Sequence, residues 1–337
     1  MHNIFRKNNN VLDQEMDEYF KIETNVINEN KLIHKAIKRY GFIDNFKLDI
    51  KQIVLPLFFL LFLLPFFVSL LMSFLIASKS TYNFYYNISS ILLGMIAFIW
   101  IVYNKFKVLN KKKIYIFFIA FPFMRIFLLI ISTLVAILFK LDSNSNEYTT
   151  MTLAIELLNS IALLLIVCFF IRKNIVVKVW WKKSFSKRNL WVTFIIIAVG
   201  FGIFYLLQFV LNLIPNAISN NGSVSENQSS LIKMTNTNFG IVTLFISAVI
   251  VAPIFEEVIY RYFVSLFFNH SIWGYFCSTI YFAFLHVAAN GDFVNIFPYF
   301  SLGIVNGFIY YYFRNLAPCI AIHFIGNLLS FILILTM

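Results

Sequence analysis

Charged residues are scarce in this sequence. They make up 12% of its 337 residues, whereas soluble domains carry about 25%. Hydrophobic residues reach 60%, and they gather in about nine apolar runs of roughly 20 residues, the length that spans a bilayer as a helix. The composition therefore excludes an ordinary soluble domain and predicts an all-α, polytopic transmembrane helical bundle of about eight or nine helices.

Signatures of several other chemistries are also missing. The three cysteines stand alone in apolar segments, which gives neither a disulfide framework nor a Cys-x-x-Cys metal pattern. There is no Gly-x-Ser-x-Gly, no Cys/His arrangement and no His-Glu-x-x-His. The first 52 residues are polar and mixed in charge, so we expect the first apolar run to direct insertion in place of a cleaved signal peptide.

Positive charge is distributed as membrane orientation requires. The net charge is +12, and 22 of the 27 Lys and Arg residues fall in residues 1–52, 104–113 and 172–190 or at Arg314. The connections on the opposite side would hold only Lys79, Lys140 and Lys233. The positive-inside rule therefore predicts an integral membrane protein with a cytoplasmic N-terminus, and a lipid bilayer, with no nucleic acid, as the partner of this basic chain.

Composition divides the chain into four regions. Residues 1–52 form a polar cytoplasmic region, and residues 53–214 form a five-helix membrane region with few polar side chains. Residues 215–238 form a polar external loop rich in Asn and Ser, and residues 239–337 form a membrane region that holds nearly all the groups suited to chemistry. In this last region we expect helices at 239–268, 271–288, 293–313 and 316–335, and we expect Pro253 to break or restart the first of them.

Two adjacent carboxylates, Glu256 and Glu257, lie inside the first of these apolar runs. Because ionisable groups at membrane depth are costly, such a pair is a hypothesis of function by default. Glu257 and Arg261 are four residues apart, so they share a helix face and can form an ion pair. Glu256 is rotated by about 100° from Glu257, and it remains the freer carboxylate, suited to general acid or base chemistry.

Two later apolar runs each carry one histidine. Phe282 and His286 are four residues apart, and so are His323 and Asn327. A helical hairpin that turns near residues 269–270 would bring His286 to nearly the depth of Glu256, because both lie about 18–22 Å along their helices from the turn. His323, about 10 Å into the last helix, can join them if the turn projects beyond the membrane.

We therefore expect Glu256, His286, His323 and Asn327 to converge in a polar pocket within the membrane. Gly303 and Gly307, four residues apart, would let their helix approach its neighbours closely. Two chemistries fit the pocket. Glu256, His286 and His323 could bind a divalent metal such as zinc with an open water position. Alternatively, Glu256 and His286 could activate a water while His323 and Asn327 stabilise the oxyanion.

The three motifs together resemble a known family. They read Glu256-Glu257-Val-Ile-Tyr-Arg261, Phe282-Ala-Phe-Leu-His286 and His323-Phe-Ile-Gly-Asn327. Their composition and order resemble the CAAX protease and bacteriocin-processing (CPBP, or Abi) family, which includes the CAAX prenyl protease 2, over about residues 245–330. One departure is Tyr262, where many members of the family have glycine.

The resemblance implies an α-helical intramembrane endopeptidase. It implies Glu256 as the catalytic base, His286 as its assistant or a metal ligand, and His323 and Asn327 as metal ligands or oxyanion donors. By the same resemblance, the remaining motif residues order the site or contact the substrate: Glu257, Arg261 and Phe282. Members are known both as metalloproteases and as glutamate-dependent enzymes without an obligatory metal.

The Phe, Ile, Asn and Lys bias suggests an AT-rich bacterial genome, and with it a bacterial cell membrane. The substrate would then be a membrane-embedded or membrane-adjacent peptide, such as a bacteriocin, a pheromone or a surface protein, in preference to a prenylated protein. Two other interpretations remain open. The first is a non-catalytic membrane protein of the same fold, with an immunity or regulatory role. The second is a small-solute or proton transporter, which the absence of inverted repeats disfavours.

Overall fold

The computed structural model describes residues 56, 59–76, 78–103, 130–131, 133–135, 137–140, 146–173, 190–218, 225–268 and 271–336. The chain divides into two compact units, residues 1–56 and 57–337, and nearly all of the described residues belong to the second. The polar region predicted at residues 1–52 lies outside the described residues.

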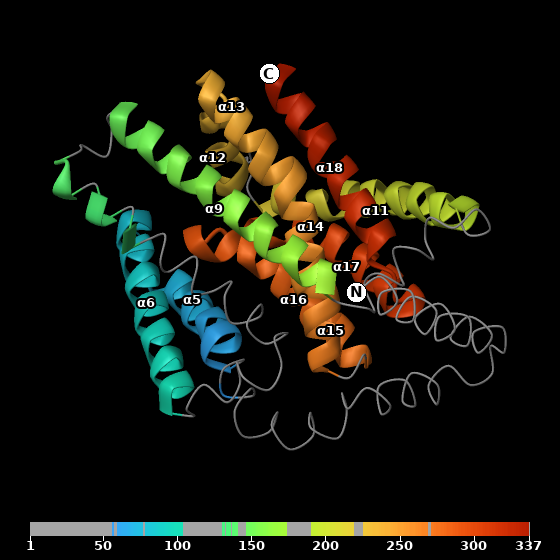
Figure 1. The fold of residues 1–337 in the computed structure, drawn as a ribbon, viewed down its shortest axis with the longest axis horizontal. Coiled ribbons are helices and arrows are strands. Elements are labelled where there is room, and N and C mark those ends of the chain that lie inside the picture. The colour runs from blue at the N-terminus through green and yellow to red at the C-terminus, as the bar shows by residue number, and fades with distance from the viewer. Residues whose placement is uncertain are drawn as a thin grey trace, which may run out of the picture. The chain divides into compact units, whose positions relative to one another are not determined.

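Every regular element in the described ranges is helical, as the composition predicts (Figure 1). The N-terminal part of this unit contains a π-helical segment and four α-helices: η3 (Phe59–Leu63), α5 (Leu64–Leu75), α6 (Lys79–Tyr103), α9 (Asn146–Lys173) and α11 (Leu190–Ile218). A short polar helix, α12 (Glu226–Met234), then precedes the C-terminal helices. Ser225 caps α12, because its side chain accepts a hydrogen bond from the backbone N–H of Gln228.

The C-terminal part is a series of contiguous helices. The first membrane helix of this part is built from α13 (Asn238–Leu244), η4 (Phe245–Val251), α14 (Ala252–Glu257), η5 (Val258–Phe263) and α15 (Val264–Phe267). After it come α16 (Ile272–Val287), the short 3₁₀ turns η6 (Ala288–Asn290) and η7 (Phe293–Asn295), α17 (Ile296–Phe313) and α18 (Leu316–Thr336). The predicted hairpin between residues 268 and 271 is therefore present, with α15 packed against α16.

Seven helical stretches in the described residues are long and apolar enough to cross a membrane: Thr81–Trp100, Glu147–Leu165, Leu190–Ile218, Asn238–Phe263, Ile272–Asn290, Phe293–Phe313 and Leu316–Thr336. The first predicted run is represented by the shorter apolar helix α5, and most of the run predicted at 114–139 lies outside the described residues. The protein is an integral membrane protein, and its helix count agrees with the eight or nine expected.

Glycines bring three of the helices close together. At Gly307 of α17, a Cβ atom would lie 2.9 Å from the ring of Tyr275 in α16, and at Gly303 it would lie 3.1 Å from the Thr279 side chain. The predicted close approach of this helix is therefore present. On the other side of α17, a Cβ at Gly200 of α11 would come within 2.8 Å of Ile309. Close packing through small residues is a common way for membrane helices to associate.

Pro253 does not break its helix, but the α-helical segment α14 begins at Ala252 with the proline in its first turn, so of the predicted break or restart the restart is present. The helix continues from Asn238 to Phe263 because the turn before the proline is π-helical, and the N–H of Ala252 bonds to the Ser247 carbonyl five residues earlier. In that register the Ala248 carbonyl would receive the N–H of residue 253, which proline lacks. The missing donor is replaced from α18, where Asn327 Nδ2 donates to the Ala248 oxygen at 2.7 Å.

Candidate active site

Glu257 lies at the centre of a fully buried ion-pair network. Its Oε2 accepts from Arg261 Nε at 2.9 Å, so the predicted pair across one helical turn is present. Its Oε1 lies 2.9 Å from Nδ1 of His323 in α18. Neither the carboxylate nor the guanidinium has any exposed side-chain surface. Buried charges of this kind persist only when they are paired and hydrogen-bonded, so these contacts also tie α18 to the helix that carries the two glutamates.

Arg261 is held by further contacts with α16. Its Nη1 donates to Ser278 Oγ at 2.7 Å, and its guanidinium carbon lies 5.1 Å from the centre of the Phe282 ring. Ser278, Phe282 and His286 succeed one another at intervals of four residues, so they share one face of α16. Ser278 and Phe282 on that face contact the Arg261 guanidinium, and Phe282 also lies beside the rings of His286 and His323.

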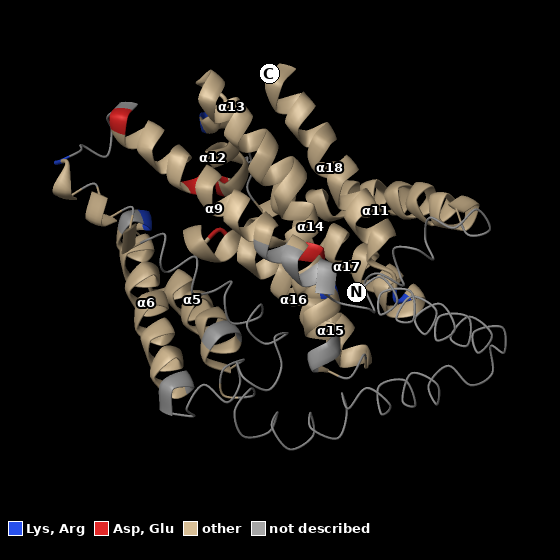
Figure 2. Cartoon of the chain, viewed as in Figure 1, with Lys and Arg blue, Asp and Glu red and all other residues tan. Residues whose placement is uncertain are grey.

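Glu256 is placed differently from its neighbour. Its side chain is 20% exposed, and its Oε2 atom is buried with no hydrogen-bond partner among the described residues. That oxygen lies 3.9 Å from Nε2 of His323. Figure 2 shows acidic colouring at α14, inside a bundle whose helices carry few charged residues. The freer carboxylate expected from the sequence is thus next to an imidazole in the interior of the bundle.

In both histidines, Nδ1 faces an oxygen acceptor. Nδ1 of His286 lies 2.8 Å from the Phe282 carbonyl oxygen, which can only accept, so Nδ1 carries the proton. Nδ1 of His323 faces the Glu257 carboxylate in the same way. In both neutral rings the lone pair is then on Nε2, the nitrogen that is suited to accept a proton or bind a metal.

His286 is separated from the ion-pair network by an aromatic layer. The Phe282 ring centre lies 4.7 Å from the His286 ring and 5.7 Å from the His323 ring. The opposite neighbour of His286 is Tyr299 of α17, stacked on it with ring centres 4.5 Å apart. The predicted site residues therefore meet as two groups: one contains Glu256, Glu257, Arg261 and His323, and the other contains His286 on the far side of Phe282.

Asn327 contacts a backbone carbonyl in this structure. One amide hydrogen on Nδ2 is donated to Ala248, as described above, and the amide has a second hydrogen. Its role as an oxyanion donor remains a prediction. Its contact with the Ala248 carbonyl was not predicted, because the sequence alone does not reveal the π-helical register before Pro253.

Residues outside the three motifs contact Tyr299, the aromatic neighbour of His286. The Tyr299 hydroxyl lies 3.1 Å from both Ser225 Oγ and Asn227 Nδ2, at the start of α12. The start of α12 also contacts the turn that follows His286, because Asp292 Oδ2 accepts a hydrogen bond from the backbone N–H of Glu226 at 3.0 Å. The polar helix α12 of the predicted external loop therefore contacts the aromatic neighbour of a predicted site residue.

The first two described helices hold the turn that follows His286. The Ala288 carbonyl accepts hydrogen bonds from Tyr82 at 2.6 Å and from Ser69 at 3.2 Å. Gly291 has φ of +67°, and a Cβ there would lie 3.0 Å from the Tyr82 ring. Glycine is suited to this turn because it has both the required left-handed backbone and the space for the aromatic ring.

The predicted metal ligands are not grouped in this structure. In the described part of the chain, no three His, Cys, Asp or Glu side chains are clustered in a way that could hold a metal ion. Glu256 and His323 are neighbours, whereas the resolved contacts of His286 are with Phe282 and Tyr299. The arrangement does not fit the three-residue ligand set, and a metal cofactor remains a prediction from the resemblance.

Ser278 and Tyr299 were not singled out from the sequence, although each carried a signal. Ser278 stands four residues before Phe282 and eight before His286, on the same face of α16. Tyr299 stands four residues before Gly303 and eight before Gly307, on the face of α17 that packs against α16. Extending each motif by one more helical turn would have found both residues.

Comparisons with known proteins locate the similarity in this part of the chain. Residues 238–329 match the family model described as "Type II CAAX prenyl endopeptidase Rce1-like". An uncharacterized protein of Mycoplasma capricolum subsp. capricolum is 28% identical over 208 residues, which are 60% of this chain and 62% of that protein. The UPF0177 protein YaiF of Lactococcus lactis subsp. lactis is 27% identical over 154 residues, 45% of this chain and 67% of that protein. The chain thus spans about two thirds or less of the length of these curated relatives. No solved structure matches.

Proposed function

Since residues 238–329 belong to the Rce1-like family of type II CAAX prenyl endopeptidases, we propose that this protein is an intramembrane endopeptidase. Its substrate would be a membrane-embedded or membrane-adjacent peptide, such as a bacteriocin, a pheromone or a surface protein. The observation that carries the proposal is the buried, unpartnered Oε2 atom of Glu256, 3.9 Å from Nε2 of His323.

The chemistry follows from the two acceptors that face each other. An ionised carboxylate oxygen and an imidazole Nε2 with a lone pair cannot hydrogen bond to one another, but one water can donate a hydrogen to each. Its oxygen lone pairs would then point away from both groups, toward a peptide carbonyl. Glu257 keeps the tautomer of His323 fixed, because it binds the proton on Nδ1.

The proposed reaction has two proton transfers. Glu256 removes a proton from the water as its oxygen bonds to the carbonyl carbon, and the carbonyl oxygen becomes an oxyanion. Asn327 would donate its second amide hydrogen to that oxyanion. Glu256 then returns the proton to the amine nitrogen as the carbon–nitrogen bond breaks, which yields a carboxylic acid and an amine.

One observation favours a second candidate function. Glu257, Arg261, His323 and Asn327 all have partners inside the protein that stabilise the helix packing. A non-catalytic immunity or regulatory protein of the same fold would need these contacts but would not need an unpartnered oxygen on Glu256. The two candidate functions therefore differ at Glu256: the peptidase needs a carboxylate oxygen that can accept a proton, and the non-catalytic protein does not.

The variant Glu256→Gln tests this difference. It keeps the size of the side chain and removes its ability to accept a proton, so we expect cleavage to fall by at least about 100-fold, as removal of a general base commonly does. The assay uses purified protein in liposomes with a lipid-anchored, quenched fluorescent peptide library, and cleavage sites are read by mass spectrometry. The matched control is Glu147→Gln, at an exposed position in the first turn of α9. Full cleavage by Glu256→Gln at normal protein level would contradict the catalytic proposal.

A further inference from the structure

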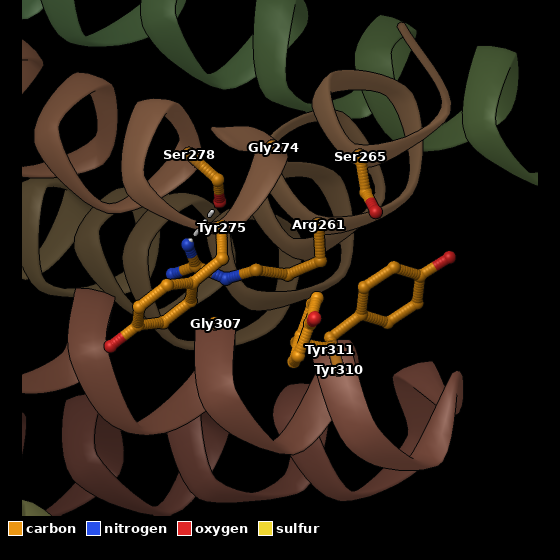
Figure 3. A pocket seen from close by; sticks show the side chains of 8 residues that line it. All are labelled: Arg261, Ser265, Gly274, Tyr275, Ser278, Gly307, Tyr310 and Tyr311. Atoms are coloured by element: carbon orange, nitrogen blue, oxygen red, sulfur yellow. Dashed lines mark hydrogen bonds between the residues drawn. The ribbon is translucent and has the colours of Figure 1, made fainter. Parts of the chain in front are cut away.

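A small cavity lies beside Arg261, between α16 and α17 (Figure 3). Its volume is about 10 Å³, close to the smallest space that holds one water molecule. Besides Arg261, five of the residues that line it carry hydroxyl groups: Ser265, Tyr275, Ser278, Tyr310 and Tyr311. The cavity is therefore large enough for a single water, and whether it holds one depends on the polar atoms that lack a partner beside it.

The guanidinium of Arg261 has one nitrogen that no protein group satisfies. Its Nε donates to Glu257 and its Nη1 donates to Ser278, whereas Nη2 is buried and has no hydrogen-bond partner among the described residues. The residue is 1% exposed, so bulk water does not reach that nitrogen directly. Arginine keeps its charge and its five donor hydrogens under all ordinary conditions, so a buried Nη2 requires an acceptor.

The charge balance decides what that acceptor is. The positive charge of Arg261 is already compensated by Glu257 at 2.9 Å, so no net positive charge remains to attract an anion. The volume also suits water better than a larger ion. The hydroxyl of Ser278 already accepts from Nη1, and it still has a hydrogen of its own to donate. A water beside it can accept both that hydrogen and one from Nη2.

We infer that this cavity binds one ordered water, held by Arg261 Nη2 and the Ser278 hydroxyl, as a fixed part of the ion-pair network. The water completes the hydrogen bonding of the guanidinium and so holds it against Glu257. Glu257 in turn sets the orientation of His323, whose Nε2 faces Glu256. Ser278 and the water are positioning groups, and their effect on cleavage rests on the proposed function. The presence of the water does not.

X-ray radiolytic labelling of the purified protein tests the inference, because a bound water generates hydroxyl radicals that oxidise the side chains next to it. We expect Tyr310, which is 2% exposed and lines the cavity, to be oxidised about tenfold faster than Tyr260, which is 2% exposed and does not line it. Equal rates for these two tyrosines in the unaltered protein would overturn the inference.

Two variants at Ser278 sharpen the result. Ser278→Val fills the cavity with a methyl group, so labelling of Tyr310 should fall to the rate of Tyr260. Ser278→Ala enlarges the cavity and should leave the labelling in place. Thr243→Val removes a buried hydroxyl outside the cavity and should change nothing. Labelling that survives Ser278→Val would also overturn the inference.

Cleavage measured on the same variants separates this inference from the proposed function. If both hold, Ser278→Val lowers cleavage by about tenfold or more through misplacement of His323, and Ser278→Ala lowers it less. A protein without peptidase activity would still show the labelling pattern. An active protein with no preferential labelling would keep the proposed function and lose the water site.

Discussion

The neighbouring residues Glu256 and Glu257 carry the same carboxyl group but differ in their hydrogen-bond partners. Both oxygens of Glu257 accept hydrogen bonds, from Arg261 and from His323, whereas one oxygen of Glu256 is buried and has no hydrogen-bond partner in the described part of the chain. Adjacent residues of a helix point about 100° apart, which sends one carboxylate to the packed interface with α18 and α16 and leaves the other beside Nε2 of His323. One glutamate therefore stabilises the helix packing, and its neighbour remains available to a water.

The pairing of Glu257 makes Arg261 important for stability. Arg261→Met leaves a carboxylate uncompensated in the interior, and we expect a loss of roughly 3–5 kcal/mol in the free energy of unfolding. Adding Glu257→Gln should recover a large part of that loss, because the amide carries no charge and its oxygen can still accept from His323. Stability is measured by titration with sodium dodecyl sulfate in mixed micelles.

The half-exposed ion pair between Lys79 and Glu226 provides the control. Lys79→Met should cost no more than about 1 kcal/mol, because the one charge that remains, the Glu226 carboxylate, is hydrated in the variant. An Arg261→Met protein as stable as Lys79→Met would mean that the buried pair contributes nothing to folding.

At the scale of the element, the segment from Asn238 to Phe267 combines α-helical and π-helical turns on both sides of α14. The π-helical turns allow the chain to pass through Pro253 and to place Glu257 and Arg261 on the face that meets α16 and α18. Such turns concentrate at functional sites, since each one changes the direction of the side chains that follow. In this protein the turn before the proline creates a carbonyl acceptor, and α18 supplies the donor.

This complementarity predicts a compensating pair of substitutions. Asn327→Ala removes the donor to the Ala248 carbonyl and should lower the free energy of unfolding by about 1–3 kcal/mol. Pro253→Ala restores a backbone N–H that can bond to the same carbonyl. The double variant should therefore be more stable than Asn327→Ala alone, as measured by the same detergent titration. Additive effects of the two changes would show that Asn327 and Pro253 do not act on one acceptor.

At the scale of the whole molecule, positive charge and apolar length predict the same topology. The nine predicted runs would place residues 1–52, 104–113 and 172–190 on the cytoplasmic side and the loop that contains α12 outside the cell. Tyr299 and His286 would then lie toward the external face, and the turn between α15 and α16 would lie toward the cytoplasm.

Cysteine labelling in intact cells tests this topology. We expect Ser230→Cys, at an exposed position of α12, to react with a membrane-impermeant maleimide added from outside. Lys182→Cys, in the predicted cytoplasmic loop 172–190, should react only after the cells are permeabilised. The unaltered chain, with its three native cysteines, gives the background. The reverse pattern would invert the predicted orientation.

Much of this architecture could be predicted because bilayer physics leaves few choices. Apolar runs of membrane length must be helical, so the helices and the hairpin near residues 269–270 follow from the sequence. The pairing of Glu257 with Arg261 follows from their spacing alone. The partners of His323 and Asn327 do not, because they depend on how α18 rotates and slides against the glutamate-bearing helix. That placement is decided by packing and by the π-helical register, which hydrophobic patterns do not record.

The double hydrogen bond to the Ala288 carbonyl has a consequence for anyone who would work with a shortened form of the chain. Its donors, Ser69 and Tyr82, lie more than 150 residues before the segment that matches the family. A fragment trimmed to that segment would expose the corner after His286 to solvent or lipid with its acceptor unpaired. A hybrid that takes the corresponding segment from a relative should therefore also contain the hydroxyl groups that correspond to Ser69 and Tyr82.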